Sequence, residues 1–178
     1  MLNNLLNRRN VRAMVWGLGC LLAVAILLPQ GNAKDPVKFK PFKLKTLDGT
    51  KKTLVDYTNK VTLVSFFFPS CAFCKVSLPE VQKMYDKYKE QGLSVVFINV
   101  IPQEKKLITS FMSEHNMNIP VLIGASQASL MRDYELKATP THYLLGEQGE
   151  VLLYQNGYKP GDEKVLEDKI VEALQIAP

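Results

Sequence analysis

The chain has 178 residues, of which 47% are hydrophobic and 22% are charged, a balance that is ordinary for a globular protein with one sizeable core. Its formal net charge is +5, but Arg8, Arg9 and Arg12 precede residue 34, in a stretch that contains no acidic residue. The rest of the chain carries 19 basic and 17 acidic residues, so its net charge is only +2. Because no stripe of Arg and Lys with interleaved aromatic residues occurs either, the sequence excludes a nucleic-acid interface.

Residues 1–33 have the pattern of an export signal. A positive segment, NRRNVR, precedes an uncharged apolar run of 16 residues over 13–28, and small residues follow at Gly31 and Ala33. Either this leader is cleaved after Ala33, or the apolar run remains as a single uncleaved membrane anchor, for which it is slightly shorter than the roughly 20 residues preferred. In both cases the positive flank stays in the cytoplasm and the domain is exported, to the periplasm or the outer face of the cytoplasmic membrane.

Residues 34–41 are expected to form a linker, and residues 42–178 to form one domain. Alternation on both sides of Asp48–Gly49 predicts a β-hairpin over 42–54. A nearly continuous apolar run predicts a strand, buried on both faces, over 61–68. The remaining elements predicted in chain order are a helix over 74–90, a strand over 93–100, a helix over 105–115, a strand over 119–124, a helix over 125–134, strands over 141–146 and 150–157, and a helix over 163–176.

This order of elements predicts the class of the fold. Strands alternate with helices and then end in a hairpin and a last helix, which is typical of an α/β protein with a mixed central sheet flanked by helices. Pro79 falls inside the helix predicted over 74–90, and it is expected to kink that helix because it has no N–H to donate.

The chemistry of the domain is indicated by two cysteines spaced C-x-x-C. Cys20 lies in the leader, so the exported part keeps only Cys71 and Cys74, which allow one intrachain disulfide. Cys71 stands between a buried strand and a helix, where free N–H groups and the helix dipole are expected to stabilise a thiolate and lower its pKa from about 8.5. Cys74 lies one turn further on and is expected to be more buried. An attacking thiol beside a resolving thiol is what dithiol exchange requires.

Other roles for the two cysteines fit less well. Attachment of haem requires His directly after the second cysteine, and position 75 is Lys. A structural zinc site prefers four ligands, whereas the exported part offers only the two cysteines with His115 and His142. Two inert buried thiols are the remaining alternative.

A second motif, KATPTHYLL, covers residues 137–145. The bond before Pro140 opens a predicted strand and can be cis. Proline cannot donate to a sheet ladder, so this position is left free for another partner.

Five segments together resemble one family. They are FKLKTLDGTKKTL, LVSFFFPSCAFCKVSLPEV, VVFINV, IPVLIG and ATPTHYLLGEQGEVLLYQNG. Over residues 40–176 the chain resembles the exported thioredoxin-like proteins of the TlpA/ResA type. The resemblance implies a thioredoxin-like fold with an N-terminal β-hairpin and a βα insertion between residues 100 and 124.

The resemblance also implies the roles of individual residues. Cys71 would be the attacking thiol and Cys74 the resolving thiol of a thiol-disulfide oxidoreductase. Pro140 would be the cis-proline that faces the disulfide, and Thr139 would present its backbone to a bound polypeptide. Several members of the family reduce apocytochrome c before haem is attached, and others act on other exported thiol proteins.

The sequence departs from the family pattern at the aromatic residue before the first cysteine and at the two positions that can carry a buried acid. Ser70 stands where the family usually has Trp, although Phe73 is able to replace that aromatic ring. The two positions where the family carries a buried acid are Ser65 and Ser77, and neither hydroxyl is a general base near neutral pH.

Another group must then accept the proton of the buried thiol. By strand alternation His142 lies on the face of Pro140, and its ordinary pKa of about 6.5 suits proton transfer. We therefore expect His142 to take part of the role of the missing acid, the alternative being a core histidine satisfied by hydrogen bonds. Glu80 is a further candidate for this proton relay, with a solvated helix residue as its alternative.

Two other functions use similar residues. A peroxiredoxin shares the scaffold, but its P-x-x-x-T/S-x-x-C pattern fails here, because the fourth and seventh residues after Pro69 are Phe73 and Val76. A copper-delivery protein is the second alternative, with Cys71, Cys74 and His142 converging on a soft metal, although known chaperones of this fold use a longer C-x-x-x-C spacing.

The sequence thus predicts an exported enzyme that reduces protein disulfides through Cys71 and Cys74. No metal and no organic cofactor is expected beyond this redox-active disulfide. The expected partners are a protein disulfide as substrate and a membrane thiol carrier as the electron donor, the latter by analogy with the family alone.

Overall fold

The computed structural model describes residues 36–176. The leader predicted over 1–33 lies outside the described residues. Within 36–176, none of the helices combines the length and the apolar character needed to cross a membrane.

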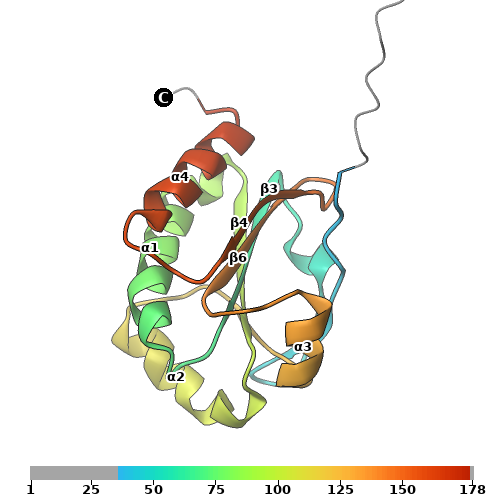
Figure 1. The fold of residues 1–178 in the computed structure, drawn as a ribbon, viewed down its shortest axis with the longest axis vertical. Coiled ribbons are helices and arrows are strands. Elements are labelled where there is room, and N and C mark those ends of the chain that lie inside the picture. The colour runs from blue at the N-terminus through green and yellow to red at the C-terminus, as the bar shows by residue number, and fades with distance from the viewer. Residues whose placement is uncertain (1–35, 177–178) are drawn as a thin grey trace, which may run out of the picture. The chain divides into compact units, whose positions relative to one another are not determined.

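Seven strands form one mixed sheet, in the order β2-β1-β5-β4-β3-β6-β7 (Figure 1). Strand β3 lies inside the sheet, parallel to β4 on one side and antiparallel to β6 on the other. The predicted α/β class with a mixed sheet is therefore confirmed. The strands are β1 (Lys43–Thr46), β2 (Lys51–Thr53), β3 (Val61–Phe67), β4 (Leu93–Asn99), β5 (Val121–Ile123), β6 (Thr141–Gly146) and β7 (Val151–Asn156).

The helices cover both faces of this sheet, and Figure 1 shows α1 and α4 on one side with α3 on the other. The α-helices are α1 (Ala72–Tyr88), α2 (Lys105–Glu114), α3 (Gln127–Asp133) and α4 (Asp162–Ala173). Three short 3-10 helices are η1 (Leu54–Tyr57), η2 (Lys89–Gln91) and η3 (Pro102–Glu104). Pro79 lies inside α1, which continues through it as one helix. Between residues 100 and 124, α2 and β5 occupy the stretch predicted as a βα insertion.

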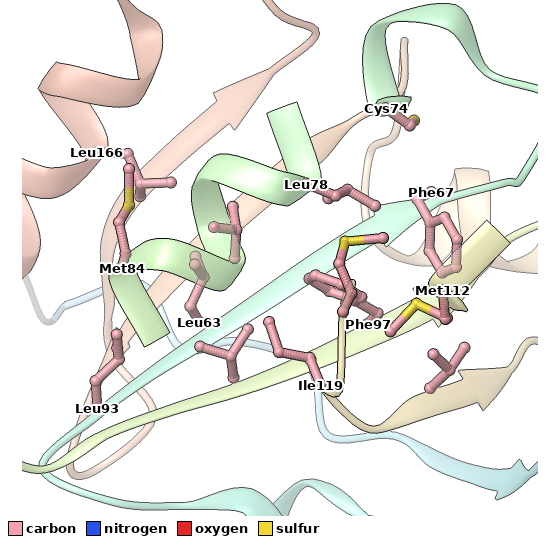
Figure 2. Packing of buried hydrophobic residues seen from close by; sticks show 14 of the residues in the cluster. Leu63, Phe67, Cys74, Leu78, Met84, Leu93, Phe97, Met112, Ile119 and Leu166 are labelled. Carbon is pink, nitrogen blue, oxygen red and sulfur yellow. The ribbon is translucent and has the colours of Figure 1, made fainter. Parts of the chain in front are cut away.

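Strand β3 is buried on both faces because each face meets a separate apolar cluster. Leu63 and Phe67 join the cluster beneath α1, α2 and α4, which Figure 2 shows from close by. Val64 and Phe66 join the opposite cluster, beneath α3 and the N-terminal segment. Side chains alternate across a strand, so a continuous apolar run is what a strand covered on both faces requires.

The prediction of a linker over 34–41 is wrong for its last residues. The ring of Phe39 is buried and lies 5.1 Å from the ring of Tyr134. Its backbone N–H donates to the carbonyl oxygen of Gly149 at 2.9 Å, and Lys38 forms an isolated antiparallel bridge with Glu150. An aromatic side chain in a short charged segment was the signal, because burying it removes a large apolar area from water.

Candidate functional site

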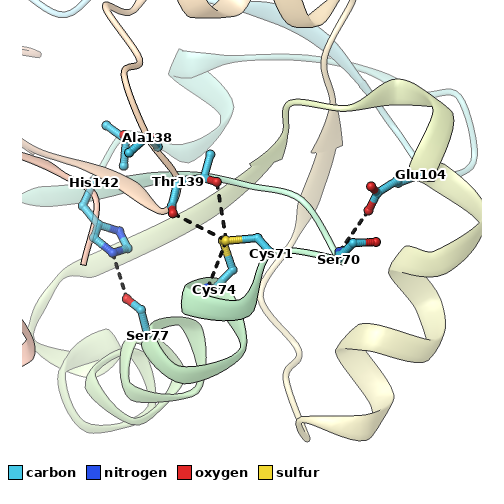
Figure 3. The surroundings of a disulfide bond; sticks show 9 residues. Ser70, Cys71, Cys74, Ser77, Glu104, Ala138, Thr139 and His142 are labelled. Carbon is cyan, nitrogen blue, oxygen red and sulfur yellow. Dashed lines mark hydrogen bonds between the residues drawn. A yellow bond between two sulfur atoms is a disulfide. The ribbon is translucent and has the colours of Figure 1, made fainter. Parts of the chain in front are cut away.

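The two cysteines lie where β3 ends and α1 begins, and a disulfide joins them (Figure 3). The helix begins at Ala72, two residues before the predicted start, because the Cys71 sulfur is its N-cap: it accepts a hydrogen bond from the Cys74 N–H at 3.2 Å. Cys71 keeps 6% of its surface exposed, whereas Cys74 is fully buried. Cys71 is thus the cysteine that solvent reaches.

The loop before β6 faces this disulfide. The Thr139–Pro140 peptide bond is cis. The hydroxyl of Thr139 donates to the Cys71 sulfur at 3.4 Å, and the carbonyl oxygen of Thr139 lies 3.5 Å from the same atom (Figure 3). The structure therefore brings together Cys71, Cys74, Thr139 and Pro140, residues that the sequence predicted as one site.

Asn156, at the end of β7, holds this loop in place. Its side-chain oxygen accepts hydrogen bonds from the backbone N–H of Ala138 at 3.0 Å and of Lys137 at 3.3 Å. Sequence reasoning missed Asn156, and the available signal was an Asn-Gly pair at the end of the strand predicted over 150–157. The loop would otherwise leave these N–H groups without partners.

His142 lies on β6 between two serines, with 2% of its surface exposed. Its Nδ1 is 2.8 Å from the hydroxyl of Ser65 on β3, and its Nε2 is 3.0 Å from the hydroxyl of Ser77 on α1. Burial lowers the pKa of His142 to about 4, against a smaller opposing effect of the Asp162 carboxylate. The imidazole therefore does not keep the ordinary pKa of about 6.5, and it is neutral at neutral pH. Its part in the proton relay stays a prediction, beside the alternative of a core histidine with hydrogen-bond partners at both nitrogens.

A small cavity adjoins this histidine. Its volume is about 10 Å³, roughly the space of one water molecule, and it is bounded by Ser77, Glu80, His142, Gln155 and Asp162 among others. The side-chain oxygen of Gln155 is buried and has no hydrogen-bond partner among the described residues. Glu80 forms a 2.8 Å ion pair with Lys83 on the outer surface of α1, so it connects the cavity with solvent.

The loop before Cys71 has an acidic partner that sequence reasoning did not predict. The backbone N–H of Ser70 donates to the Glu104 carboxylate at 3.0 Å, across 34 residues (Figure 3). Glu104 ends η3, just before α2. Since Ser70 precedes the N-cap cysteine, this contact fixes the chain immediately ahead of the disulfide.

Phe73 projects into solvent one residue before Cys74. Its side chain is 58% exposed, and its ring lies 6.4 Å from the ring of Tyr158. Val76 is also exposed on the same end of α1. An exposed apolar surface thus lies next to the disulfide on α1.

The residues of the copper alternative are not arranged as one ligand set. Both nitrogens of His142 lie within hydrogen-bond distance of serine hydroxyls. In the part of the chain that the structure describes, no group of three or more His, Cys, Asp or Glu side chains is placed to hold a metal ion.

Known proteins share both the sequence pattern and the fold. The Redoxin family matches residues 33–170. Sporulation thiol-disulfide oxidoreductase A of Bacillus subtilis is 27% identical over 68% of this chain and 74% of its own length. Thiol-disulfide oxidoreductase ResA of Bacillus subtilis is 24% identical over 84% of this chain and 89% of its own.

A solved structure supports the same fold. The thioredoxin domain of a thiol-disulfide oxidoreductase from Bacteroides vulgatus superimposes with a TM-score of 0.67 at 17% identity, covering 78% of this chain and 96% of that one. The thioredoxin-like fold predicted from the sequence is confirmed. The chain belongs to the Redoxin family and is a thiol-disulfide oxidoreductase, the activity for which its curated relatives are named.

Proposed function

We propose that Cys71 is the attacking thiol and Cys74 the resolving thiol of a reductase that acts on protein disulfides. The observation that carries this proposal is the asymmetry of the pair: Cys71 is the N-cap of α1 and touches the Thr139 loop, whereas Cys74 is buried one turn below it. The N–H of Cys74 and the hydroxyl of Thr139 both donate to the Cys71 sulfur, and such donors favour a thiolate.

The reaction has two steps. The Cys71 thiolate attacks one sulfur of a substrate disulfide, forms a mixed disulfide and releases the other sulfur as a thiolate. After losing its proton, Cys74 attacks the Cys71 sulfur, forms the intramolecular disulfide and releases the reduced product. No metal or organic cofactor enters either step. Electrons for the next cycle come from a membrane thiol carrier.

The proton of Cys74 needs an acceptor, and we place it outside the buried imidazole. Cys74, Ser77 and Glu80 follow one another at intervals of three on α1, so neighbouring members face each other. In this route Ser77 takes the proton of Cys74 and gives its own, through a water in the adjoining cavity, to the carboxylate of Glu80. Neutral His142 holds the Ser77 hydroxyl in the position that the relay requires.

The relay can be tested by separating the two steps. Ser77→Ala should slow the release of product from the mixed disulfide severalfold and leave its formation unchanged. Glu80→Gln should shift the pH dependence of product release. The control is Glu90→Gln, which removes an exposed carboxylate in η2, directly after α1, and should leave that pH dependence unchanged. Unchanged release in both Ser77→Ala and Glu80→Gln would eliminate this route.

Export of the domain agrees with the leader pattern over 1–33. Apocytochrome c before haem attachment is one candidate substrate, taken from the family resemblance. Cleavage after Ala33 would give a free periplasmic protein, whereas retention of residues 13–28 would tether it to the membrane surface near a thiol donor.

The direction of electron flow is tested by the reduction potential of the Cys71–Cys74 couple in the full chain. A reductase should have a potential near that of thioredoxin, about −270 mV. A value near about −120 mV would identify an oxidant of folding proteins instead. Cys74→Ser should accumulate a mixed disulfide with its substrate, and Cys71→Ser should form none.

A further inference from the structure

A pocket with basic walls lies beside β1 and the end of β5, and we call it the lysine pocket. Its volume is about 340 Å³. Lys43 and Lys45 of β1 and Lys105, the first residue of α2, line it together with Thr46 and Ile123. None of the described residues that line it is acidic. Its volume lies within the range of small-molecule sites, so it has room for more than a single ion.

The register of the sheet brings a fourth lysine to the same face. Side chains alternate along a strand, so Lys43 and Lys45 point to one face of β1, while Leu44 is buried on the other. Lys51 on β2 is the Cα partner of Lys45, and directly opposite residues share a face. Like charges in this position destabilise a sheet, and an anion held near them would offset that repulsion.

The first turn of α2 adds a second unfavourable placement of positive charge. Lys105 and Lys106 are the first two residues of this helix, and its first turn contains no acidic residue. The N-terminus of a helix carries a partial positive charge, which is unfavourable for cations and favourable for anions. An anion in the pocket would therefore be attracted both by the helix terminus and by the lysines.

The neighbouring carboxylates are engaged elsewhere. In the stretch that the structure describes, the three lysines of the pocket and Lys51 form no ion pair. Asp48 is bonded within the turn between β1 and β2, where its carboxylate accepts the N–H of Thr50 at 3.0 Å. Glu104 accepts the N–H of Ser70 at 3.0 Å. The pocket thus keeps a net positive charge.

Protection of a sheet edge explains only one of these lysines. Lysines are common on edge strands, where they prevent pairing with other chains. Strand β2 is an edge strand, which accounts for Lys51. Strand β1 lies between β2 and β5, however, and Lys105 belongs to a helix. The lysines that line the pocket therefore need another explanation.

We propose that the lysine pocket binds a phosphate monoester, either a small soluble molecule or the headgroup of a membrane lipid. A phosphate monoester carries about −1.5 to −2 charges at pH 7 and three acceptor oxygens, which suits three converging ammonium groups better than a single carboxylate does. The side chains of Thr46 and Ile123 offer a hydroxyl and an apolar contact to the organic part of the ester. This inference goes beyond the proposed function and does not rest on it.

The test measures binding by NMR, with the full chain in nanodiscs. In the first arm the discs are phosphatidylcholine, and glycerol 3-phosphate is added at constant ionic strength. In the second arm the discs also contain phosphatidic acid, which presents the same phosphate monoester on a lipid. We expect the backbone amides of Lys45, Gly124 and Ala125, in the wall of the pocket, to shift in at least one arm. A shift in the first arm identifies a soluble ester, and a shift in the second arm alone identifies a lipid headgroup.

Variants locate the binding in the pocket. Lys45→Gln and Lys105→Gln each remove one of three ammonium groups, so each should weaken binding about fivefold. The matched control is Lys60→Gln, which removes the same charge at an exposed lysine just before β3, outside the pocket, and should leave binding unchanged. All three variants should reduce glutathione disulfide at the rate of the unaltered chain, which checks that each is folded.

Three results would overturn the assignment. If these amides shift in neither arm, the lysines form a solvated surface without a ligand. Equal binding by the unaltered chain, Lys45→Gln and Lys105→Gln would place the ester elsewhere on the protein. Shifts that sodium chloride reproduces at equal ionic strength would show a general effect of salt. Because reduction of glutathione disulfide is measured separately, a failure here leaves the proposed function standing.

Discussion

The sulfur of Cys71 lies 3.5 Å from the carbonyl oxygen of Thr139, although 68 positions separate the two residues in the chain. Strands β3 and β6 are antiparallel neighbours, so the end of β3 and the start of β6 meet at one edge of the sheet. The disulfide therefore lies against the loop that precedes β6. This contact joins the reacting sulfur to the loop that carries the cis-proline.

Thr139→Val should make the Cys71 thiolate harder to form. The substitution keeps the shape of the side chain and removes the hydroxyl that donates to the sulfur. Losing a donor destabilises the thiolate but not the thiol, so the pH midpoint for alkylation of Cys71 should rise by about one unit, which corresponds to ~1.4 kcal/mol. The measurement is the rate of reaction with iodoacetamide against pH, followed on the Cys71 peptide in a Cys74→Ser background.

Thr58→Val is the control for this prediction. Thr58 lies at the end of η1, where its hydroxyl donates to the carbonyl of Leu54 at 3.3 Å and touches neither cysteine. The pH midpoint for alkylation of Cys71 in Thr58→Val, made in the Cys74→Ser background, should match that of Cys74→Ser alone. A midpoint that stays in place in Thr139→Val would mean that the helix N-terminus alone stabilises the thiolate.

The burial of His142 predicts a loss of stability between pH 6.5 and 4. Burial lowers the pKa of this side chain from 6.5 to about 4 in the folded state, so over that interval the unfolded chain binds the proton and the folded chain does not. The free energy of unfolding should fall by about 3 kcal/mol as pH decreases through this window, and the contribution of His142 is fully present above pH 6.5. Urea denaturation at half-unit steps of pH measures it.

His142→Gln should remove this part of the pH dependence, because glutamine is close in size and does not titrate. The control is His115→Gln, at the other histidine of the described residues, which is half-buried at the end of α2. In that variant the free energy of unfolding should depend on pH as it does in the unaltered chain. If His142→Gln also keeps it, the imidazole is protonated in the folded protein and its burial does not control the titration.

Most of the fold could be predicted from local patterns. The apolar runs of β3 and β4 and the stripes of α1 and α4 repeat with the periods of strands and helices, and the structure has those elements within a few residues of the predicted ranges. The start of α1 was misplaced because its N-cap is a sulfur, an acceptor that cap rules based on Ser, Thr, Asp and Asn do not include. Phe39 was misplaced because its partners, Tyr134 and Tyr143, come from the other end of the chain.

The candidate site was predicted only where its members are close in sequence or share a recognisable motif. The spacing of Cys71 and Cys74 and the Thr-Pro pair carry local signals. The contact of Glu104 with the Ser70 backbone and the placement of Asn156 beneath the loop depend on how distant strands end at one edge of the sheet. The state of His142 also could not be predicted, because its pKa is set by burial.

Glu104→Ala should loosen the segment ahead of Cys71. The carboxylate accepts the Ser70 N–H at 3.0 Å near the surface, so its loss should cost about 1 kcal/mol or less in overall stability. Locally, the amide of Ser70 should exchange with solvent roughly fivefold faster by hydrogen-exchange NMR, since its acceptor is gone. Glu114→Ala, at an exposed carboxylate that ends α2, the helix that follows Glu104, is the control and should leave that rate unchanged.

Two phenylalanines of the same segment should differ sharply in their effect on stability. Phe67 is fully buried beside Phe97 (Figure 2), with the rings of Phe97 and Phe111 at 5.7 and 5.5 Å, whereas Phe73 is 58% exposed. Phe67→Ala removes a packed ring and leaves a cavity, so the free energy of unfolding should decrease by about 3–5 kcal/mol. Phe73→Ala should change it by roughly 0.5 kcal/mol or less, because water already covers most of the ring. Urea denaturation of both variants at pH 7 measures the difference, and a loss of 2 kcal/mol or more in Phe73→Ala would show that this ring supports the fold instead of remaining available to a substrate.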